Sequence, residues 1–235
     1  MRSVYLLCGL LGTLLLQGQN NRIDFGWGVG VPFGAFSAVD LEAEGSGKAK
    51  PGRSLHFSYS RMIKEDLWLG VSVFEFVNKV DDQKMLDAFY QEHSGLSAAI
   101  IGRNWNNIAL MIGIAKEIQF TNSNFSIEPN VRLGLLRSFR SGILITDGNN
   151  GDSLNLAGEE ETNSNALAIM LGFSPSYTFS SKAMLSLEVD YFYSAPEITV
   201  TSEEMTYSTP LVREVTNYTQ AIHILSLRLG VTFFF

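Results

Sequence analysis

The chain has 235 residues, of which 46% are hydrophobic and only 17% are charged. That charged fraction is below the roughly 25% that is usual for soluble domains. The formal net charge of −7 argues against a nucleic-acid partner, which would require a basic stripe, and the length favours one domain.

The first 19 residues have the pattern of a secretory signal peptide. Arg2 supplies the positive flank, and residues 4–16 form an apolar stretch that is too short for a membrane-spanning helix, which needs about 20 residues. A membrane anchor is the alternative. We expect residues 1–19 to be removed and residues 20–235 to form a single barrel domain. Cys8 would leave with the signal, so no disulfide, cysteine–metal site or cysteine nucleophile is expected.

Residues 23–36 alternate strictly between two kinds of side chain, which is the period-two pattern of a β-strand. One side holds Ile23, Phe25, Trp27, Val29, Val31 and Phe33, and the other holds Asp24, Gly26, Gly28, Gly30, Pro32 and Gly34. The glycines would leave room inside a narrow barrel. After a polar loop at 39–52, residues 53–63 and 67–77 continue the alternation on either side of a short turn.

Residues 78–105 have the least clear pattern. Residues 81–93 show a weak helical periodicity, and residues 96–102 fit either an extended arm above the membrane or a spanning strand. We expect one long loop. The fourth strand would be 107–120, with Lys116 on its apolar side, where a charge costs about 2–4 kcal/mol at midplane and little near the interface. Lys116 must therefore reach the interface, or a bulge near Ala115 turns it away.

The rest of the chain repeats the same rhythm. We expect strands at 125–137, 165–179, 183–193 and 221–235, a short turn at 180–182, and long polar loops at 138–164 and 195–217. Short and long connections alternate throughout, as they do between the periplasmic turns and surface loops of outer-membrane barrels. The even strand count puts both ends of the barrel chain on the periplasmic side.

So many strands with one apolar face indicate lipid rather than a protein core as their surroundings. No later stretch approaches eighteen apolar residues, and a membrane crossing by strands requires a closed barrel, in which every backbone group is paired. The sequence therefore predicts an all-β fold, an eight-stranded antiparallel up-and-down transmembrane β-barrel. Aromatic residues near the strand ends fit interfacial girdles.

With these features, the chain resembles the small outer-membrane β-barrel family of Gram-negative bacteria, the OmpA/OmpX type. The resemblance is carried by the signal segment, the eight amphipathic strands, the loop rhythm and the ending Leu-Arg-Leu-Gly-Val-Thr-Phe-Phe-Phe at 227–235. It implies an outer-membrane location and lipid as a partner. It also implies that Leu229, Val231, Phe233 and Phe235 act as a recognition signal for the outer-membrane insertion machinery.

Charged residues collect on the side of the strands that would face the barrel interior. They are Asp24, Glu128, Arg132, Glu188, Asp190 and Arg228. An eight-stranded barrel is just wide enough for side chains to fill, so these groups are expected to form a lumen ion-pair network that plugs it. The alternative is a narrow small-solute path that opens when the pairs exchange.

Catalytic and metal-binding patterns are weak. His56 is the inward-facing histidine, and with Ser58, Ser60 or Asp24 it could suggest a hydrolase, but no nucleophile motif surrounds it. His93 falls in a loop and His223 on the lipid side. We expect no catalytic residues, no metal and no cofactor. The acidic runs at 159–161 and 203–204 are expected to be solvated. The Asp-Ser-Leu at 152–154 is expected to match a short motif by chance.

The favoured role is structural, or interaction with an unknown ligand at the cell surface through the long loops. A narrow channel is the second hypothesis, and a barrel enzyme that acts on outer-membrane lipid is the third.

Overall fold

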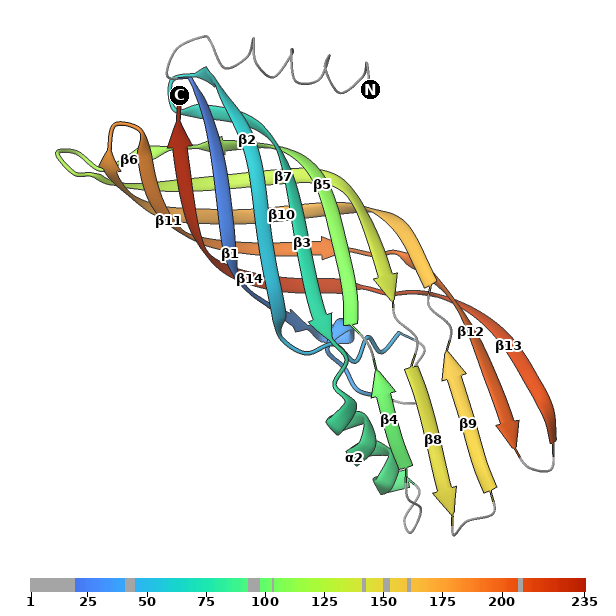
Figure 1. Cartoon of the computed structure of the whole chain (residues 1–235). Helices are drawn as coiled ribbons and strands as arrows, with labels where there is room; N and C mark the ends of the chain where they lie inside the picture. The colour runs from blue at the N-terminus through green and yellow to red at the C-terminus, as the bar shows by residue number, and fades with distance from the viewer. Residues whose placement is uncertain are drawn as a thin grey trace, which may run out of the picture.

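The computed structural model describes residues 20–40, 45–92, 98–102, 104–140, 143–149, 153–159, 162–206 and 209–235; the expected signal peptide, residues 1–19, lies outside them. Eight long strands form a closed antiparallel barrel (Figure 1). They are β1 (Asn21–Phe33), β2 (Gly52–Lys64), β3 (Leu67–Lys79), β5 (Asn104–Lys116), β7 (Phe125–Arg140), β10 (Thr162–Ser180), β11 (Ala183–Ser194) and β14 (Ile222–Phe234). Each pairs with its neighbours in chain order, and β14 pairs with β1 to close the ring. The predicted up-and-down barrel is confirmed.

The barrel has two unlike ends. The turn end holds the short turns, the start of β1 and the end of β14. The loop end holds the long connections and a second, five-stranded sheet that stands beyond the barrel (Figure 1). Its strands are β4 (Ala98–Gly102), β8 (Ile143–Asn149), β9 (Ser153–Glu159), β12 (Glu197–Thr206) and β13 (Thr209–Thr219), in the order β13-β12-β9-β8-β4.

The second sheet corrects two predictions. Residues 138–164 and 195–217 were expected to be loops, but most of each segment forms a β-hairpin, β8–β9 and β12–β13. Residues 96–102 fitted either an arm or a spanning strand, and β4 is an arm, because it pairs with β8 outside the barrel. Polar hairpins of this kind are held together by backbone pairing, which an apolar pattern does not reveal.

The segment predicted as one loop at 78–105 also contains a helix, α2 (Asp82–Glu92), and the first residues of β5. The first strand ends at Phe33, earlier than expected, because Gly34 (φ +61°) begins the short 3-10 helix η1 (Gly34–Phe36). Within the described residues, neither helix is long and apolar enough to cross a membrane.

Lys116 ends β5, and the predicted strand 107–120 breaks there. Only the short β6 (Ile118–Gln119) follows, paired with β7. The Lys116 ammonium donates to the backbone carbonyl of Glu65 at 2.7 Å and lies 3.5 Å from the Asp66 carboxylate, both in the β2–β3 turn. The lysine therefore reaches the turn end, and of the two alternatives its geometry favours the interface.

The outer wall of the barrel is apolar along nearly its whole height. Its outward side chains include Trp27 (64% exposed), Leu229 (63%), Leu135 (60%), Leu133 (58%), Ile112 (56%) and Leu110 (55%). An apolar surface of this extent does not persist in water on a monomeric protein, so the wall marks the part of the molecule that lies in the bilayer.

Candidate functional site

The candidate site is the barrel interior, where buried charges form two clusters. In the central cluster, Arg228 on β14 has a side chain with no exposed surface. Its Nε donates to a Glu188 oxygen at 2.8 Å, its Nη2 donates to Asp190, and its Nη1 donates to the Ser226 and Ser54 hydroxyls at 2.6 and 3.0 Å. One guanidinium therefore pairs with two carboxylates from β11, as the pairing of β11 with β14 allows.

His56 and Arg132 complete the central cluster. The Nδ1 atom of His56 lies 3.1 Å from a Glu188 oxygen, and its ring stacks on Phe74 with centroids 4.6 Å apart. Arg132 Nη1 lies 3.6 Å from an Asp190 oxygen. The guanidinium carbons of Arg132 and Arg228 lie 5.3 and 5.1 Å from the Phe74 ring centre, within the range of a cation–π contact.

The second cluster lies nearer the turn end and depends on Arg22. Both terminal nitrogens of Arg22 donate to the two Glu128 oxygens, its Nε is 3.6 Å from Asp24, and its guanidinium lies over the Trp68 ring at 4.4 Å. Asp24 also accepts hydrogen bonds from the hydroxyls of Ser58 (2.7 Å) and Thr232 (2.6 Å).

The structure thus divides the six predicted lumen charges between two places. Glu188, Asp190, Arg228 and Arg132 meet in the central cluster, whereas Asp24 and Glu128 meet in the turn-end cluster. Arg22 was not among the predicted lumen residues, because the first strand was predicted to begin at residue 23. Arg22 is two residues from Asp24, so the period-two pattern could have placed it on the inner side.

Two inward glycines leave the space that the carboxylates occupy. A Cβ atom on Gly26 would lie 2.7 Å from a Glu188 oxygen, and one on Gly172 would lie 1.8 Å from an Asp190 oxygen. Both distances are shorter than a van der Waals contact. The absence of a side chain at these positions lets Glu188 and Asp190 lie against the neighbouring wall.

Toward the loop end a layer of large apolar side chains crosses the interior, alongside buried polar groups that include Asn107, Ser138 and Arg140. We call this layer the apolar seal: Phe36, Phe74, Phe76, Trp105, Phe192 and Ile224, each at most 1% exposed. The β1–β2 connection folds into the mouth, where Phe36 packs edge-on against Trp105 at 5.3 Å and the Trp105 indole donates to the Gly47 carbonyl at 2.8 Å. This layer was not predicted from the sequence, because charged side chains were expected to fill the interior.

The predicted insertion signal lies on the lipid side of β14. Leu229 and Phe233 are 63% and 49% exposed, and Val231 lies between them on the same face. The backbone of Phe235 exchanges hydrogen bonds with Asn21 at 3.0 and 3.2 Å, at the seam where the barrel closes. The structure thus gives these residues their positions, and their part in recognition stays a prediction.

The residues weighed for catalysis or metal binding lie apart. Ser58 donates to Asp24 while His56 pairs with Glu188, and the outward-facing His223 has its Nδ1 2.9 Å from the Tyr191 hydroxyl. In the part of the chain that the structure describes, no group of three or more histidine, cysteine or acidic residues could hold a metal ion. His93 and residues 152 and 160–161 lie outside the described residues, and the side chains of residues 159 and 203–204 do as well.

Comparison with solved structures returns outer-membrane barrels. A major outer membrane protein from Thermus thermophilus has a TM-score of 0.53 and 17% identity, over 92% of this chain and 99% of that one. Neisserial surface protein A has a TM-score of 0.48 and 13% identity, over 92% and 97%. Ail, the attachment invasion locus protein of Yersinia pestis, has a TM-score of 0.47 and 13% identity, over 93% and 100%.

No family model matches the chain, and no curated protein sequence matches it either. The fold is nevertheless that of a small outer-membrane β-barrel. Together with the apolar wall, this fold locates the chain in the outer membrane.

Proposed function

We propose that this outer-membrane barrel is a non-catalytic surface-interaction protein, in which a plugged barrel supports the five-stranded sheet as a contact surface. The observation that carries the proposal is that, among the described elements, one edge of that sheet is covered by a helix and the other is not. At one edge, β4 is contacted by α2. At the other, β13 pairs with β12 alone among the described strands.

An uncovered edge strand presents a row of backbone N–H and C=O groups that can pair with another chain. β13 offers 11 residues of such an edge. Its described side chains include Val215, which is 59% exposed, and the exposed Glu214 and Asn217. The chemistry that fits this edge is an extended polypeptide segment that adds a strand, with backbone hydrogen bonds as the main source of affinity.

The barrel interior supports a role as anchor rather than as a path for solutes. Its charges are paired at short distance, and the apolar seal lies between them and the loop end. Opening such a lumen would expose unpaired charge to an apolar layer, which is costly.

The edge can be tested with cells that display the chain, using an array of random extended dodecapeptides as the probe. We expect the wild-type chain to retain a subset of peptides, and a variant with residues 199–217 replaced by a two-residue turn to retain none. Val215→Lys should weaken binding, since lysine is a residue with which natural edge strands block pairing. Thr199→Lys is the matched control, because it adds the same charge on β12, one strand in from the edge.

Insertion of each variant is checked by its heat-sensitive folded band on a gel. Equal peptide retention by the wild-type chain and the shortened variant would contradict the proposal. So would an equal loss of binding in Val215→Lys and Thr199→Lys.

A further inference from the structure

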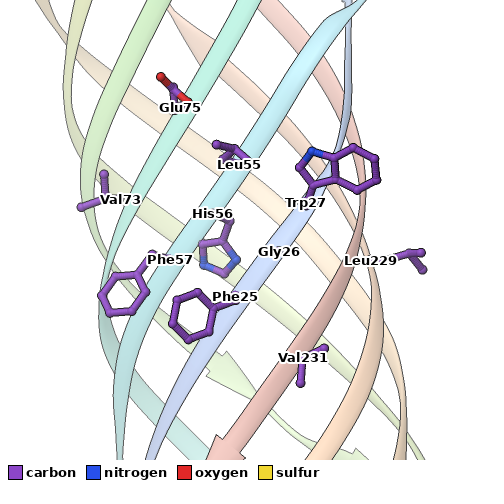
Figure 2. Close-up of a pocket in the computed structure, with 10 residues that line it drawn as sticks. All are labelled: Phe25, Gly26, Trp27, Leu55, His56, Phe57, Val73, Glu75, Leu229 and Val231. Carbon is purple, nitrogen blue, oxygen red and sulfur yellow. The ribbon is translucent and has the colours of Figure 1, made fainter.

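A groove of about 530 Å³ crosses the outer wall over β1, β2, β3 and β14 (Figure 2). Its lining is almost wholly apolar and comes from two neighbouring rungs, a rung being the set of residues that pair across adjacent strands. The first rung is Val231, Phe25, Phe57 and Val73, and the next one toward the loop end is Leu229, Trp27, Leu55 and Glu75. Gly26 and His56 complete the lining.

The third rung places charge at the loop-end margin of this groove. It consists of Leu227, Val29, Arg53 and Val77. The Arg53 side chain is 52% exposed, and its Nη2 donates to Glu75 at 2.8 Å. Lys79 is exposed on β3, two residues beyond Val77, and so is a diagonal neighbour of Arg53.

An apolar groove that ends in two cations and one carboxylate matches a particular kind of molecule. Rungs are about 6.6 Å apart along a strand, so Arg53 lies one rung beyond the apolar lining and Lys79 lies two rungs beyond it. A guanidinium has five N–H donors in a planar fork that suits phosphate, and the bond to Glu75 uses only part of that fork. The arrangement therefore fits an acyl chain that carries a phosphate headgroup.

We propose that this groove binds one phosphate-bearing membrane lipid, with an acyl chain against Trp27, Leu55 and Leu229 and the phosphate on Arg53. Lys79 adds attraction for the phosphate, and Glu75 holds the Arg53 fork at the interface. The lipid belongs to the leaflet at the loop end of the barrel.

The other end of the wall supplies a matched control. A smaller groove of about 240 Å³ lies over β3, β5 and β7 and ends at Lys116. There the ammonium is already bound to the Glu65 carbonyl and lies near Asp66. The Asp66 carboxylate offsets the charge of that single ammonium, whereas Arg53 and Lys79 together exceed the charge of Glu75, so we expect no comparable lipid site at Lys116.

Trp27 gives a direct readout of groove occupancy. The chain has three tryptophans, and Trp68 and Trp105 are each 1% exposed, whereas Trp27 is 64% exposed on the groove wall. A brominated acyl chain in the groove would therefore quench Trp27 fluorescence selectively. Trp27→Phe, which should abolish the quenching, identifies the source of the signal.

The experiment uses the folded chain in dodecyl maltoside micelles with small mole fractions of brominated phosphatidic acid or of brominated diacylglycerol, which lacks the phosphate. For the wild-type chain, we expect half-maximal quenching at an about tenfold lower mole fraction of phosphatidic acid, because a charge-assisted hydrogen bond contributes on the order of a factor of ten. Arg53→Gln should remove this preference, Lys79→Gln should reduce it, and Lys116→Gln should leave it unchanged.

Three results would overturn the proposal: equal quenching by the two lipids, an unchanged preference in Arg53→Gln, or an equal loss of preference in Lys116→Gln. Displacement of brominated phosphatidic acid by millimolar inorganic phosphate would also overturn it, since the site would then belong to the free anion. Circular dichroism of each variant checks the fold, and Arg53 is exposed enough for its replacement to be tolerated.

Discussion

Arg228 is the residue on which the charge balance of the central cluster depends. Its fully buried guanidinium contacts both Glu188 and Asp190, and those carboxylates lie against the wall at Gly26 and Gly172. Removing one partner of a buried ion pair leaves an uncompensated charge, which costs more than the pair contributes when it is intact.

We therefore expect Arg228→Met to lower the free energy of unfolding by about 3–5 kcal/mol, measured by urea titration of the barrel in lipid vesicles. Arg53→Met is the matched control, because its half-exposed pair with Glu75 should contribute only about 0–1 kcal/mol. Adding Glu188→Gln and Asp190→Asn to Arg228→Met should recover much of the loss. Equal losses in the two single variants would show that burial does not set the energy of the Arg228 contacts.

For single residues, the sequence predicted which face of a strand each charged side chain occupies, but not which side chain it pairs with. Period-two alternation placed Asp24, Glu188 and Arg228 on the inner face, where they lie. It could not show that Arg228 binds two carboxylates of β11 while Asp24 and Glu128 share Arg22, since partners depend on the register between strands that are distant in the chain.

Among the elements, β14 presents an aromatic residue to the lipid on one face and another to the barrel interior on the opposite face. Phe233 is exposed on the lipid side, whereas Phe234 points inward, with its ring centre 6.0 Å from that of Trp68. Phe235 follows, with its backbone paired to Asn21 at the closing seam. We propose that the insertion machinery reads the outward aromatic residues before the seam forms, whereas the inward one belongs to the finished barrel.

We expect Phe235→Ala to slow assembly of the barrel in cells while leaving the stability of the assembled protein nearly unchanged. Pulse labelling followed by the appearance of the heat-sensitive folded band measures the rate. Phe234→Ala removes an equal side chain on the inner face, so it should lower stability in urea more than it lowers the assembly rate. If both variants assemble at the wild-type rate, the terminal segment does not act as a signal.

The elements that the sequence placed least well are those outside the lipid. The spanning strands are evident in the sequence because one face must be apolar along its whole length. No such demand acts along the whole length of β8, β9, β12 and β13: Ile198 and Val200 of β12 are buried, but most of the pairing beyond the membrane is between segments rich in polar residues. A polar hairpin and a polar loop therefore have similar compositions, and residues 138–164 and 195–217 were predicted as loops.

The whole molecule is layered along its axis, which no single strand reveals. From the turn end, the interior passes from the Arg22 cluster to the Arg228 cluster and then to the apolar seal. The seal is assembled from β3, β5, β11, β14 and the β1–β2 connection, so it forms only once the barrel has closed. Sequence alternation predicted the barrel, whereas the layering inside it depends on the relative stagger of the strands.

This layering predicts the electrical behaviour of the chain. We expect the purified barrel to show no steady openings in planar bilayers, and Arg132→Ala to behave in the same way, because removing one charge below the seal opens no path through Phe76, Phe192 and Ile224. A water-filled porin of about 16–18 strands in the same bilayers controls for detection. Steady wild-type openings that disappear in Arg132→Ala would instead assign the lumen to a narrow channel gated by its ion pairs. The apolar seal would then have to part under voltage, and the barrel could no longer be treated as an inert support for the surface sheet.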